Sequence, residues 1–483
     1  MSEHVQLWID GRWSDAEGGA TFEATSPSTG EVIGTVAEGT RADAQAAIDS
    51  ARTAWPAWAA LSAFDRAAAM ERVAAVIDER REHLARTLTL DQGKPLRAEA
   101  HDEVEELIAY FTMAAADARR AEGVLPPSVD AGKRVLVYRV PRGVVSIISP
   151  WNWPYTMPGE ILAPAIAYGN TVVWAPAPST SVCAAALASC LEAAELPRGV
   201  VNMVTGPGPV VGDEIAANPG TQTVGFIGSI ETGLSVAQRG AGKELLLEMG
   251  GNGPLVVMDD ADVDAAVTAT LTACFLNAGQ SCTAGERILV HEAVKDDYLA
   301  TLTAAIDKEI RIGDPFRDAT TLGPVNNAPT ADKTERHVGD AVDRGATVVT
   351  GGRRAPEAGS ELFYEATVLD GVTAEMEIAR EETFGPVAPV ITISSLDEAI
   401  AAVNNTEYGL LSAIFTRDLR QGLRFAETVR SGWVNVNEGT NYWESHLPFG
   451  GRAGSSSGVG RVGGRFSMDR LTELKTVIVD LGG

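Results

Sequence analysis

An alternation of β-rich and helical segments is the feature that most constrains the fold of this chain. The run NTVVWA (170–175) is followed by a helical stretch that Pro197 ends, and GVVNMVT (199–205) and TVGFIGS (223–229) are followed by turns and further helical patterns. Chains that alternate in this way form parallel sheets with helices on their faces. The sequence therefore predicts an α/β fold built on a parallel sheet.

The segments on either side extend this pattern. Residues 43–120 show helical periodicity, and residues 141–143 separate the β-rich runs RVLVYRV and GVVSIIS. After Gly250 the alternation restarts with a helix expected over 262–279. The remaining strand candidates are RILVH (287–291), ATVVT (346–350), APVITIS (388–394), LSAIFT (411–416), GWVNVN (432–437) and the C-terminal LKTVIVDLGG (474–483).

Length and charge exclude several classes of protein. A chain of 483 residues is long enough for two or three domains. Its net charge of −26 repels nucleic-acid phosphates and anionic membranes. The sequence has no run of 18 apolar residues and no signal-peptide pattern. We therefore expect a cytoplasmic protein without a nucleic-acid or membrane partner.

Cysteine and histidine are too sparse for a disulfide framework or a metal centre. The four cysteines, at 183, 190, 274 and 282, form no CxxC pair, and the six histidines form no HxxxH pair. No metal site is predicted, and a reducing compartment fits this usage. Cys282 stands apart because NAGQSCTAGERI (277–288) surrounds it with small residues. A lone cysteine is usually an inert buried thiol, but these neighbours leave room for a ligand, which makes Cys282 a candidate nucleophile.

Several motifs occur in a fixed order around this cysteine. They are SPWNWP (149–154), FIGS (226–229), LLLEMGGNGP (245–254), the Cys282 segment, EETFGPV (381–387) and LPFGGRAGSSSGVGR (447–461). Together they resemble the aldehyde dehydrogenase superfamily of NAD(P)-dependent, non-acylating enzymes, and the resemblance covers nearly the whole chain. It implies a Rossmann-like cofactor domain, an α/β catalytic domain and a small β arm for oligomerisation.

The resemblance implies oxidation of an aldehyde to a carboxylic acid. Cys282 would attack the carbonyl to give a thiohemiacetal, and Asn152 with the backbone N–H of Cys282 would hold the oxyanion. After hydride transfer, Glu248 would activate water against the thioester. Relatives that pass the acyl group to coenzyme A typically lack this glutamate, so its presence favours a free acid. By residue type alone, Asn152 also suits a turn and Glu248 a solvated surface.

The resemblance also marks candidate cofactor-binding residues. Gly228 and Ser229 stand where a strand is followed by a helix, a position that binds pyrophosphate, and Glu382 matches the carboxylate that holds the nicotinamide ribose. A solvated acidic pair is the other interpretation of Glu381 and Glu382. The full candidate set is Trp151, Gly208, Gly228, Ser229, Gly233, Glu382 and Phe384.

The sequence departs from the family pattern at two places. Ala175 and Pro178 replace the lysine and the acidic residue that bind the adenosine ribose, so the choice between NAD and NADP stays open, with Ser179 and Thr180 as alternative hydroxyl contacts. Near the C-terminus, Ala453 replaces a lysine and Val462 replaces a glutamate linked to proton relay in some relatives. Any relay in this chain therefore needs another route.

The candidate substrate pocket is largely apolar and aromatic, which favours an apolar or aromatic aldehyde. Its candidate residues are Trp153, Met157, Ser281, Tyr442 and Phe449, with Tyr155 and Trp443 beside them. Aromatic residues at such spacing also occur in cores. No arginine is clearly placed to bind a carboxylate, whereas Glu160 and Glu444 would suit a cationic group.

By resemblance, residues 1–122 and 142–249 form the cofactor domain, 250–463 the catalytic domain, and 123–141 with 464–483 the arm. The edge-strand character of ELKTVIV favours pairing with another subunit, so a homodimer or homotetramer is expected. Two other interpretations remain at this point. One is a non-catalytic binding or structural protein on the same fold, and the other is a thiol esterase that needs no cofactor.

Overall fold

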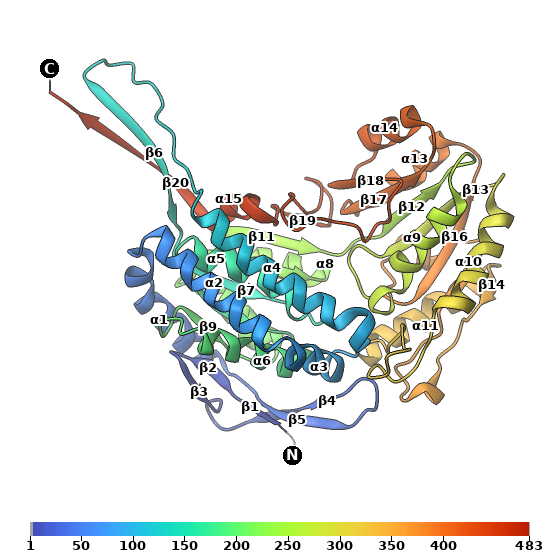
Figure 1. The fold of residues 1–483 in the computed structure, drawn as a ribbon, viewed down its shortest axis with the longest axis horizontal. Helices are drawn as coiled ribbons and strands as arrows, with labels where there is room; N and C mark the ends of the chain where they lie inside the picture. The colour runs from blue at the N-terminus through green and yellow to red at the C-terminus, as the bar shows by residue number, and fades with distance from the viewer. Residues whose placement is uncertain (1–2, 483) are drawn as a thin grey trace.

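The computed structural model describes residues 3–482, which form two lobes and a projecting two-stranded arm (Figure 1). An eight-stranded sheet forms the first lobe in the order β19-β11-β10-β7-β8-β9-β2-β3. Its strands are β2 (Leu7–Ile9), β3 (Arg12–Ser14), β7 (Val144–Ile148), β8 (Thr171–Ala175), β9 (Val201–Met203), β10 (Thr223–Gly228), β11 (Glu244–Met249) and β19 (Gly458–Val459). The strands from β11 to β9 are parallel, which confirms the predicted sheet, whereas the edge strands are antiparallel.

Helices cover the first sheet and supply most of its core contacts. They are α1 (Arg41–Ala59), α2 (Ala63–Glu79), α3 (Arg81–Asp91), α4 (His101–Ala118), α5 (Thr156–Ala167), α6 (Ser181–Ala193), α7 (Asp213–Ala217) and α8 (Ile230–Arg239). The short π-helices η1 (Leu96–Ala100) and η3 (Gly208–Gly212) and the short 3-10 helix η2 (Pro178–Thr180) lie between them. The periodicity over 65–90 predicts one helix, but Arg80 (φ −100°, ψ 12°) leaves helical geometry and divides it into α2 and α3.

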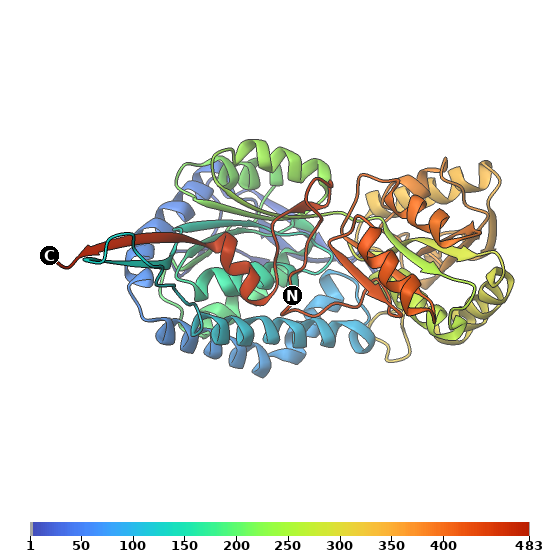
Figure 2. The same cartoon turned by 90° about the horizontal axis from the view of Figure 1, so that it is seen from above.

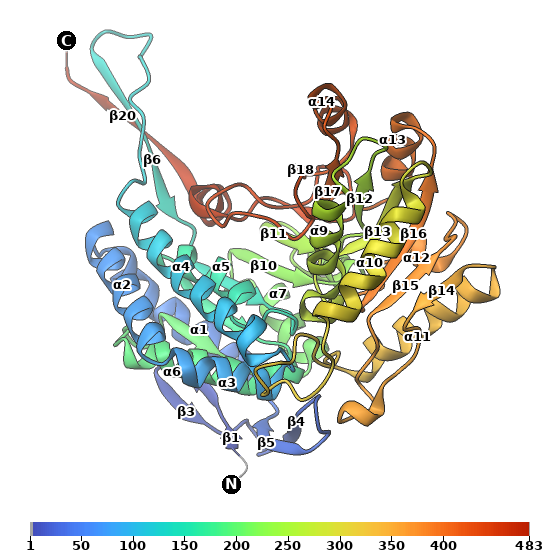
Figure 3. The same cartoon turned by 45° about the vertical axis from the view of Figure 1, so that its right-hand side comes forward.

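Local signals explain where the first helices begin. Thr40 forms a capping box with Asp43, and Ser62 accepts a hydrogen bond from the Asp65 N–H at the start of α2. Helices α2 and α4 pack side by side (Figures 1 and 3) and bury apolar side chains such as Val73 and Phe111 against each other and the sheet. This packing fixes α4, which later contributes polar groups close to the site.

The second lobe contains a seven-stranded sheet in the order β14-β15-β16-β13-β12-β17-β18. Its strands are β12 (Gly253–Val257), β13 (Gly285–His291), β14 (Thr347–Thr350), β15 (Thr367–Asp370), β16 (Val387–Ile393), β17 (Leu411–Phe415) and β18 (Trp433–Val436). Its helices are α9 (Val263–Phe275), α10 (Lys295–Glu309), α11 (Ala328–Asp343), α12 (Glu377–Arg380), α13 (Leu396–Asn404) and α14 (Leu419–Thr428), with the turns η4 (Leu276–Gly279) and η5 (Pro356–Ala358). The strand candidates between 287 and 437 all overlap strands of this sheet.

The N-terminal strands are a feature that sequence analysis did not anticipate. Strands β1 (Glu3–Val5), β5 (Val32–Ala37) and β4 (Thr21–Thr25) form a separate sheet in the order β1-β5-β4. Strands β1 (EHV) and β4 (TFEAT) are short and contain polar residues, and the apolar run of β5 (VIGTVA) is interrupted by Gly34 and Thr35, so these strands lack the longer apolar runs that marked the central strands.

The arm consists of β6 (Lys133–Pro141) paired antiparallel with β20 (Thr472–Asp480), and it extends away from both lobes (Figure 2). Leu474 and Ile478 are exposed on it. The predicted arm began at residue 464, but η6 (Gly464–Ser467) and α15 (Met468–Leu471) pack against the first lobe instead. No helix within residues 3–482 combines the length and apolar character needed to cross a membrane.

Candidate active site

A cavity of about 180 Å³ joins the residues that the sequence motifs singled out. Its lining comes from both lobes and from the glycine-rich segment 447–462, which returns to the first lobe through β19. The cavity is lined by Pro150, Trp151, Asn152, Met157, Glu160, Ile227, Gly228, Ser229, Glu248, Met249, Gly250, Cys282, Thr330, Lys333, Glu382, Phe384 and Phe449. The predicted nucleophile, oxyanion donor and base therefore share one cavity with most of the predicted cofactor-binding residues.

The segment before Cys282 has an unusual backbone. Asn277 (φ 50°) and Ala278 (φ 54°) adopt left-handed conformations that cost most residues free energy, and Gly279 (φ 74°) follows them. A Cβ at Gly279 would lie 2.1 Å from the carbonyl oxygen of Gly385, so only glycine lets this segment approach the loop that carries Glu382. This turn is what ends α9 and brings Cys282 to the cavity.

Hydrogen bonds hold the left-handed turn in place and tie it to Asn152. The Asn152 side-chain amide donates to the Gln280 carbonyl at 3.1 Å, and the Asn277 side-chain amide donates to the Asn152 carbonyl at 2.9 Å. The Asn277 backbone N–H donates to Glu99 at 3.0 Å. One hydrogen of the Asn152 amide stays free of these contacts, and Asn152 lines the cavity. The amide is thus held in a fixed position relative to the Cys282 segment.

A buried ion pair supports the loop that carries Asn152. Lys94 Nζ lies 2.5 Å from Glu103, and the other Glu103 oxygen accepts the backbone N–H groups of Tyr155 and Thr156 at 2.9 and 3.3 Å. Lys94 Nζ also lies 3.2 Å from the ring centre of Trp153. Buried charges with complete pairing give a rigid support, and removing one partner leaves an uncompensated charge.

Glu248 lies on β11 with 5% of its surface exposed, and neither carboxylate oxygen makes a hydrogen bond to the described protein residues. Burial raises its pKa well above the ordinary value, nearby Glu160 raises it further, and Arg461 opposes them. A Cβ at Gly450 would lie 2.6 Å from Glu248 Oε1, so glycine leaves the carboxyl its space. Burial therefore favours the protonated form of this carboxyl.

The Cys282 sulfur lies in the same acidic surroundings. Burial raises the pKa of its thiol well above the ordinary value, and Glu382, Glu248 and Glu160 add to the shift because negative charges oppose a thiolate. Its attack on a carbonyl therefore requires a base or a positive charge beside it. The other three cysteines are buried, whereas Cys282 is partly accessible, as its small neighbours predict.

The loop 381–385 forms another wall of the cavity. Glu382 accepts the backbone N–H of Gly251 at 2.9 Å, and burial raises its pKa to about 8. Phe384 (φ 61°) is held in a left-handed conformation because Glu286 accepts its N–H at 2.8 Å. Its ring meets that of Trp151 edge to face, with centroids 5.6 Å apart and planes at 88°.

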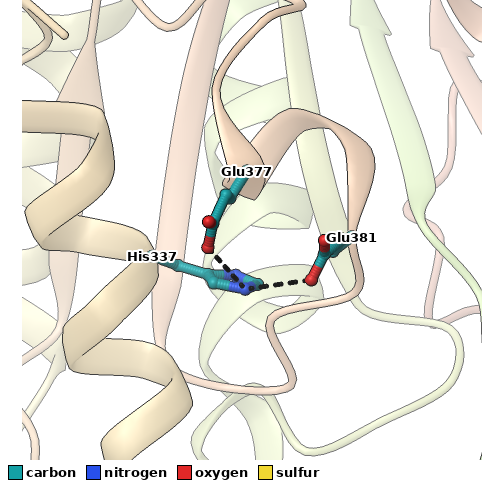
Figure 4. A group of neighbouring side chains, drawn as sticks. All are labelled: His337, Glu377 and Glu381. Carbon is teal, nitrogen blue, oxygen red and sulfur yellow. Dashed lines mark ion pairs between the residues drawn. The ribbon is translucent and has the colours of Figure 1, made fainter.

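His337 supports the same loop from α11. Its Nδ1 lies 3.1 Å from Thr383 Oγ1, and Arg336 donates to its Nε2 at 3.3 Å, so the ring is neutral and Nδ1–H is the donor. Burial, assisted by Arg336, lowers its pKa to about 4. Its Nε2 lies 3.9 Å from Glu377 and 3.7 Å from Glu381 (Figure 4). This group could offer three ligand atoms to a metal, but it lies outside the cavity lining.

The predicted cofactor residues differ in their placement. Ser229 caps α8, where its side chain accepts from the Thr232 N–H at 3.4 Å, and Gly228 lies beside it. A Cβ at Gly233 would lie 2.1 Å from the Met249 sulfur, so this glycine lets α8 pack closely on β11. Gly208 is exposed and lies outside the cavity lining.

Strand β8 ends at the site of the missing ribose-binding residues. Ala175 is buried, and Pro178 and Ser179 are exposed. Thr180, considered above as a hydroxyl contact, is only 1% exposed. None of these residues lines the cavity.

The predicted substrate residues are only partly brought together. Met157 and Phe449 line the cavity, and the Trp443 ring lies 5.5 Å from that of Phe449. Trp153, Ser281 and Tyr442 do not line it, and neither do Tyr155 and Glu444. Tyr155 is fully buried, with its hydroxyl donating to the Leu84 carbonyl at 3.1 Å. Ser281 bonds to Thr283 at 2.8 Å, and Tyr442 is 49% exposed on another face.

Sequence reasoning missed the residues that hold the active-site loops in place without lining the cavity. Lys94, Glu99 and Glu103 belong to no recognised motif, and Glu286 lies in the motif around Cys282 but was not singled out. Glu99 and Glu286 bind partners far away in the sequence, whereas Lys94 and Glu103 are only nine residues apart. Lys333 and Thr330 in the cavity lining were also missed. The clue available for Lys94 was a lone lysine before a helix rich in acidic residues, a pattern that solvated surfaces share.

Comparison with known proteins agrees with this arrangement. The sequence model of the aldehyde dehydrogenase family matches residues 13–477. The glutarate-semialdehyde dehydrogenase of Pseudomonas aeruginosa is 39% identical over 99% of this chain and 98% of its own length. The NADP-dependent succinate-semialdehyde dehydrogenase of Escherichia coli is 37% identical over 99% and 98%.

Solved structures of related enzymes also superpose closely on this chain. An Escherichia coli NADP-dependent enzyme superposes with a TM-score of 0.96 at 37% identity, covering 99% of this chain and 98% of its own. A Staphylococcus aureus betaine aldehyde dehydrogenase in complex with NAD+ gives 0.95 at 32% identity, covering 99% and 95%. The chain therefore belongs to the aldehyde dehydrogenase family of NAD(P)-dependent oxidoreductases.

Proposed function

We propose that this aldehyde dehydrogenase converts an uncharged aldehyde to the free carboxylic acid through covalent intermediates on Cys282. The observation that supports the proposal is the convergence of Cys282, Asn152 and Glu248 on one cavity. The family alone leaves open which side chains act, what the product is and which aldehyde is taken.

The first step is attack of the Cys282 sulfur on the aldehyde carbon. The thiol proton is released to water in the cavity, so that the Glu248 carboxyl is left to act in the later hydrolysis. The carbonyl oxygen then carries negative charge, and the free hydrogen of the Asn152 amide with the Cys282 backbone N–H stabilises it. Neutral donors suit this position because they are already oriented when the charge forms.

The other residues of the cavity fit a nicotinamide dinucleotide. Ser229 at the start of α8 provides an anion-binding helix end, Glu382 has a buried carboxylate suited to ribose hydroxyls, and Trp151 and Phe384 supply flat apolar faces. These residues would hold the cofactor, which when bound accepts the hydride of the thiohemiacetal. Whether NAD or NADP is preferred depends on β8, where Ala175 and Pro178 provide neither a cation nor an anion.

Hydrolysis of the resulting thioester needs a base. Glu248 in its carboxylate form takes a proton from water, the water oxygen attacks the thioester carbon, and the Cys282 sulfur leaves. A base within the cavity favours water as the acyl acceptor and a free acid as the product.

The substrate end of the cavity carries no group suited to an anionic substrate. Met157 and Phe449 provide apolar surface, while Glu160 and Glu248 would repel a carboxylate. Among residues 3–482, no arginine belongs to this lining, and Lys333 lies next to the Phe384 ring at 5.9 Å. The relatives named for glutarate and succinate semialdehydes act on anionic aldehydes. We expect this chain to favour apolar or aromatic aldehydes instead.

A panel of aldehydes tests this preference. Hexanal, benzaldehyde, succinate semialdehyde and betaine aldehyde are compared by NADH or NADPH absorbance, each with both cofactors. We expect kcat/KM for the uncharged aldehydes to exceed that for succinate semialdehyde by at least about tenfold, because burying an unpaired charge is costly. An equal or higher value for succinate semialdehyde would contradict the proposed substrate class.

Two further features extend the proposal to the assembly and location. The exposed Leu474 and Ile478 on the projecting strand β20 support pairing of the arm with another copy, as a homodimer or homotetramer. The four cysteines are free, which supports a reducing compartment such as the cytoplasm. Sedimentation velocity tests the first point, with a monomer as the contradicting result.

A further inference from the structure

Glu160 occupies an unusual position between two cavities. It lies on α5, it lines the cavity that contains Cys282 and Glu248, and it also lines a second, smaller cavity together with Tyr110 and Asp117. Only 4% of its surface is exposed, and its Oε1 makes no hydrogen bond to the described residues. A buried carboxyl oxygen without a hydrogen bond lowers the stability of the fold. Such a group therefore calls for a functional explanation.

From Glu160 a short series of polar groups leads outward through α4, which packs against α5 (Figure 3). The Tyr110 hydroxyl interacts with both Glu160 and Glu106. It donates to Glu106 Oε1 at 3.4 Å, and the two residues lie one helical turn apart. Glu106 is partly exposed, whereas Tyr110 is 2% exposed. The series therefore begins in the active-site cavity and ends at the surface.

The proposed reaction creates a need for such a path. Each hydrolysis leaves a proton on Glu248, and the next turnover needs the carboxylate again. Glu248 itself is 5% exposed and has no hydrogen-bond partner in the described protein through which the proton could leave. Of the carboxyl groups in the cavity lining, Glu160 is the one whose charge acts most on Glu248.

We propose that Glu160, Tyr110 and Glu106 form a proton relay that carries this proton from Glu248 to solvent. The inference rests on the proposed function of Glu248 as the base. The proton moves from Glu248 to the Glu160 carboxylate through water in the cavity that both side chains line. Protonated Glu160 then donates to the Tyr110 oxygen while Tyr110 donates its own proton to Glu106, so no charge is left on the phenol. Glu106 releases the proton to water.

The acidities of these groups suit the transfer. Burial, and then the charge of Glu106, raise the pKa of Glu160 to about 8, and burial with the charge of Glu103 raises the pKa of Glu106 to about 7. Lys94 faces Glu106 and opposes its shift. Protons therefore enter and leave both carboxyls near neutral pH. The step from Glu160 to Glu106 is slightly uphill, by about tenfold in its equilibrium constant, and release of the proton from Glu106 to water draws it forward.

Variants of the relay are tested in the full-length enzyme with NAD and a reactive aldehyde. Glu160→Gln removes the titrating group and keeps its shape, and Tyr110→Phe removes only the hydroxyl. Tyr168→Phe is the matched control, because its hydroxyl is also buried but makes no hydrogen bond to the described residues. Stopped-flow NADH formation separates the first burst, which reports acylation, from the steady rate, which reports hydrolysis.

We expect Glu160→Gln to lower the steady rate at least about tenfold and Tyr110→Phe by a smaller factor, with the burst rate unchanged. A small proton carrier such as imidazole should restore much of the steady rate in both, and the solvent isotope effect on that rate should rise. Tyr168→Phe should match the unmodified enzyme in all three measurements.

Other outcomes overturn the relay. An unchanged steady rate in Glu160→Gln means that the proton leaves elsewhere. A fall in burst and steady rate together, without rescue by imidazole, means that Glu160 shapes the cavity or binds a cationic substrate. Loss of activity in unmodified enzyme with every aldehyde would overturn the proposed function itself, and the relay with it.

Discussion

The Cys282 segment (276–285) and the end of β8 (175–180) illustrate two ways of building a binding surface. In the Cys282 segment, two non-glycine residues are held in left-handed conformations, and side chains from distant parts of the chain hold the turn through hydrogen bonds. At the end of β8, Ala175 is buried in the core and the exposed Pro178 and Ser179 carry no charge.

The difference reflects what each region must do. Bond formation needs the sulfur, the amide and the base within a fraction of an ångström of their productive positions, which requires many fixed contacts. Binding of an exposed ribose contributes affinity, and losing one surface charge lowers it by only about 1 kcal/mol or less. The chain can thus depart from its family at β8 and still keep the proposed reaction centre.

The largest effect is expected for Cys282→Ala. Without the sulfur no covalent intermediate forms, so dehydrogenase activity should fall at least about 10⁴-fold. Esterase activity toward a nitrophenyl ester should fall in parallel, because it uses the same nucleophile. Cys274→Ala serves as control, since that thiol is fully buried and its loss should leave activity within about twofold. Retained NADH formation in Cys282→Ala would refute the assignment.

Glu248→Gln is expected to have the next largest effect. Gln keeps the shape but removes the base, so hydrolysis should slow about 10²-fold or more while acylation still gives a burst of NADH. Mass spectrometry of the quenched enzyme should show an acyl group on Cys282.

The pH dependence sharpens this assignment. Burial raises the pKa of Glu248, and the carboxylate is the active form, so hydrolysis in the unmodified enzyme should rise with pH above the range in which an ordinary glutamate titrates. The profile of Glu248→Gln should be flat over that range. A variant that keeps the rising profile would show that another group acts as the base.

The sequence predicted the central part of the fold because apolar runs and turn residues mark buried parallel strands directly. Strands β7, β8 and β10 and the helices between them follow from such local signals. The N-terminal strands and the return of the 447–462 segment to β11 do not, because these strands are short and their pairing is not marked by a local pattern.

The candidate site residues also divide into those marked by a local sequence motif and those that depend on tertiary packing. Cys282, Asn152 and Glu248, which line one cavity, were candidates from the sequence because each lies in a compact motif. Lys94 and Glu103 were not candidates, because the sequence does not distinguish a buried ion pair from an exposed one. The burial of this pair depends on the packing of α4 against α5. The aromatic candidates Trp153 and Tyr442 illustrate the reverse error, since residue type alone does not tell whether a ring faces a cavity, a buried lysine or solvent.

Ala175→Lys is expected to have the smallest effect and tests the β8 side of the comparison. A lysine here offers a hydrogen bond and a charge to the adenosine ribose or its 2′-phosphate, and its long stem can reach the surface from a buried Cα. Calorimetry should show roughly two- to fivefold tighter binding, with the larger gain for NADP, because an exposed ion pair contributes at most about 1 kcal/mol.

Ser179→Lys is the control, since it adds the same charge on the exposed surface nearby. Equal gains in both variants would indicate a general charge effect, and no gain in Ala175→Lys would mean that the missing lysine does not limit cofactor binding. The turnover number should stay unchanged throughout, because the hydrogen bonds that position Cys282 and Asn152 do not involve β8.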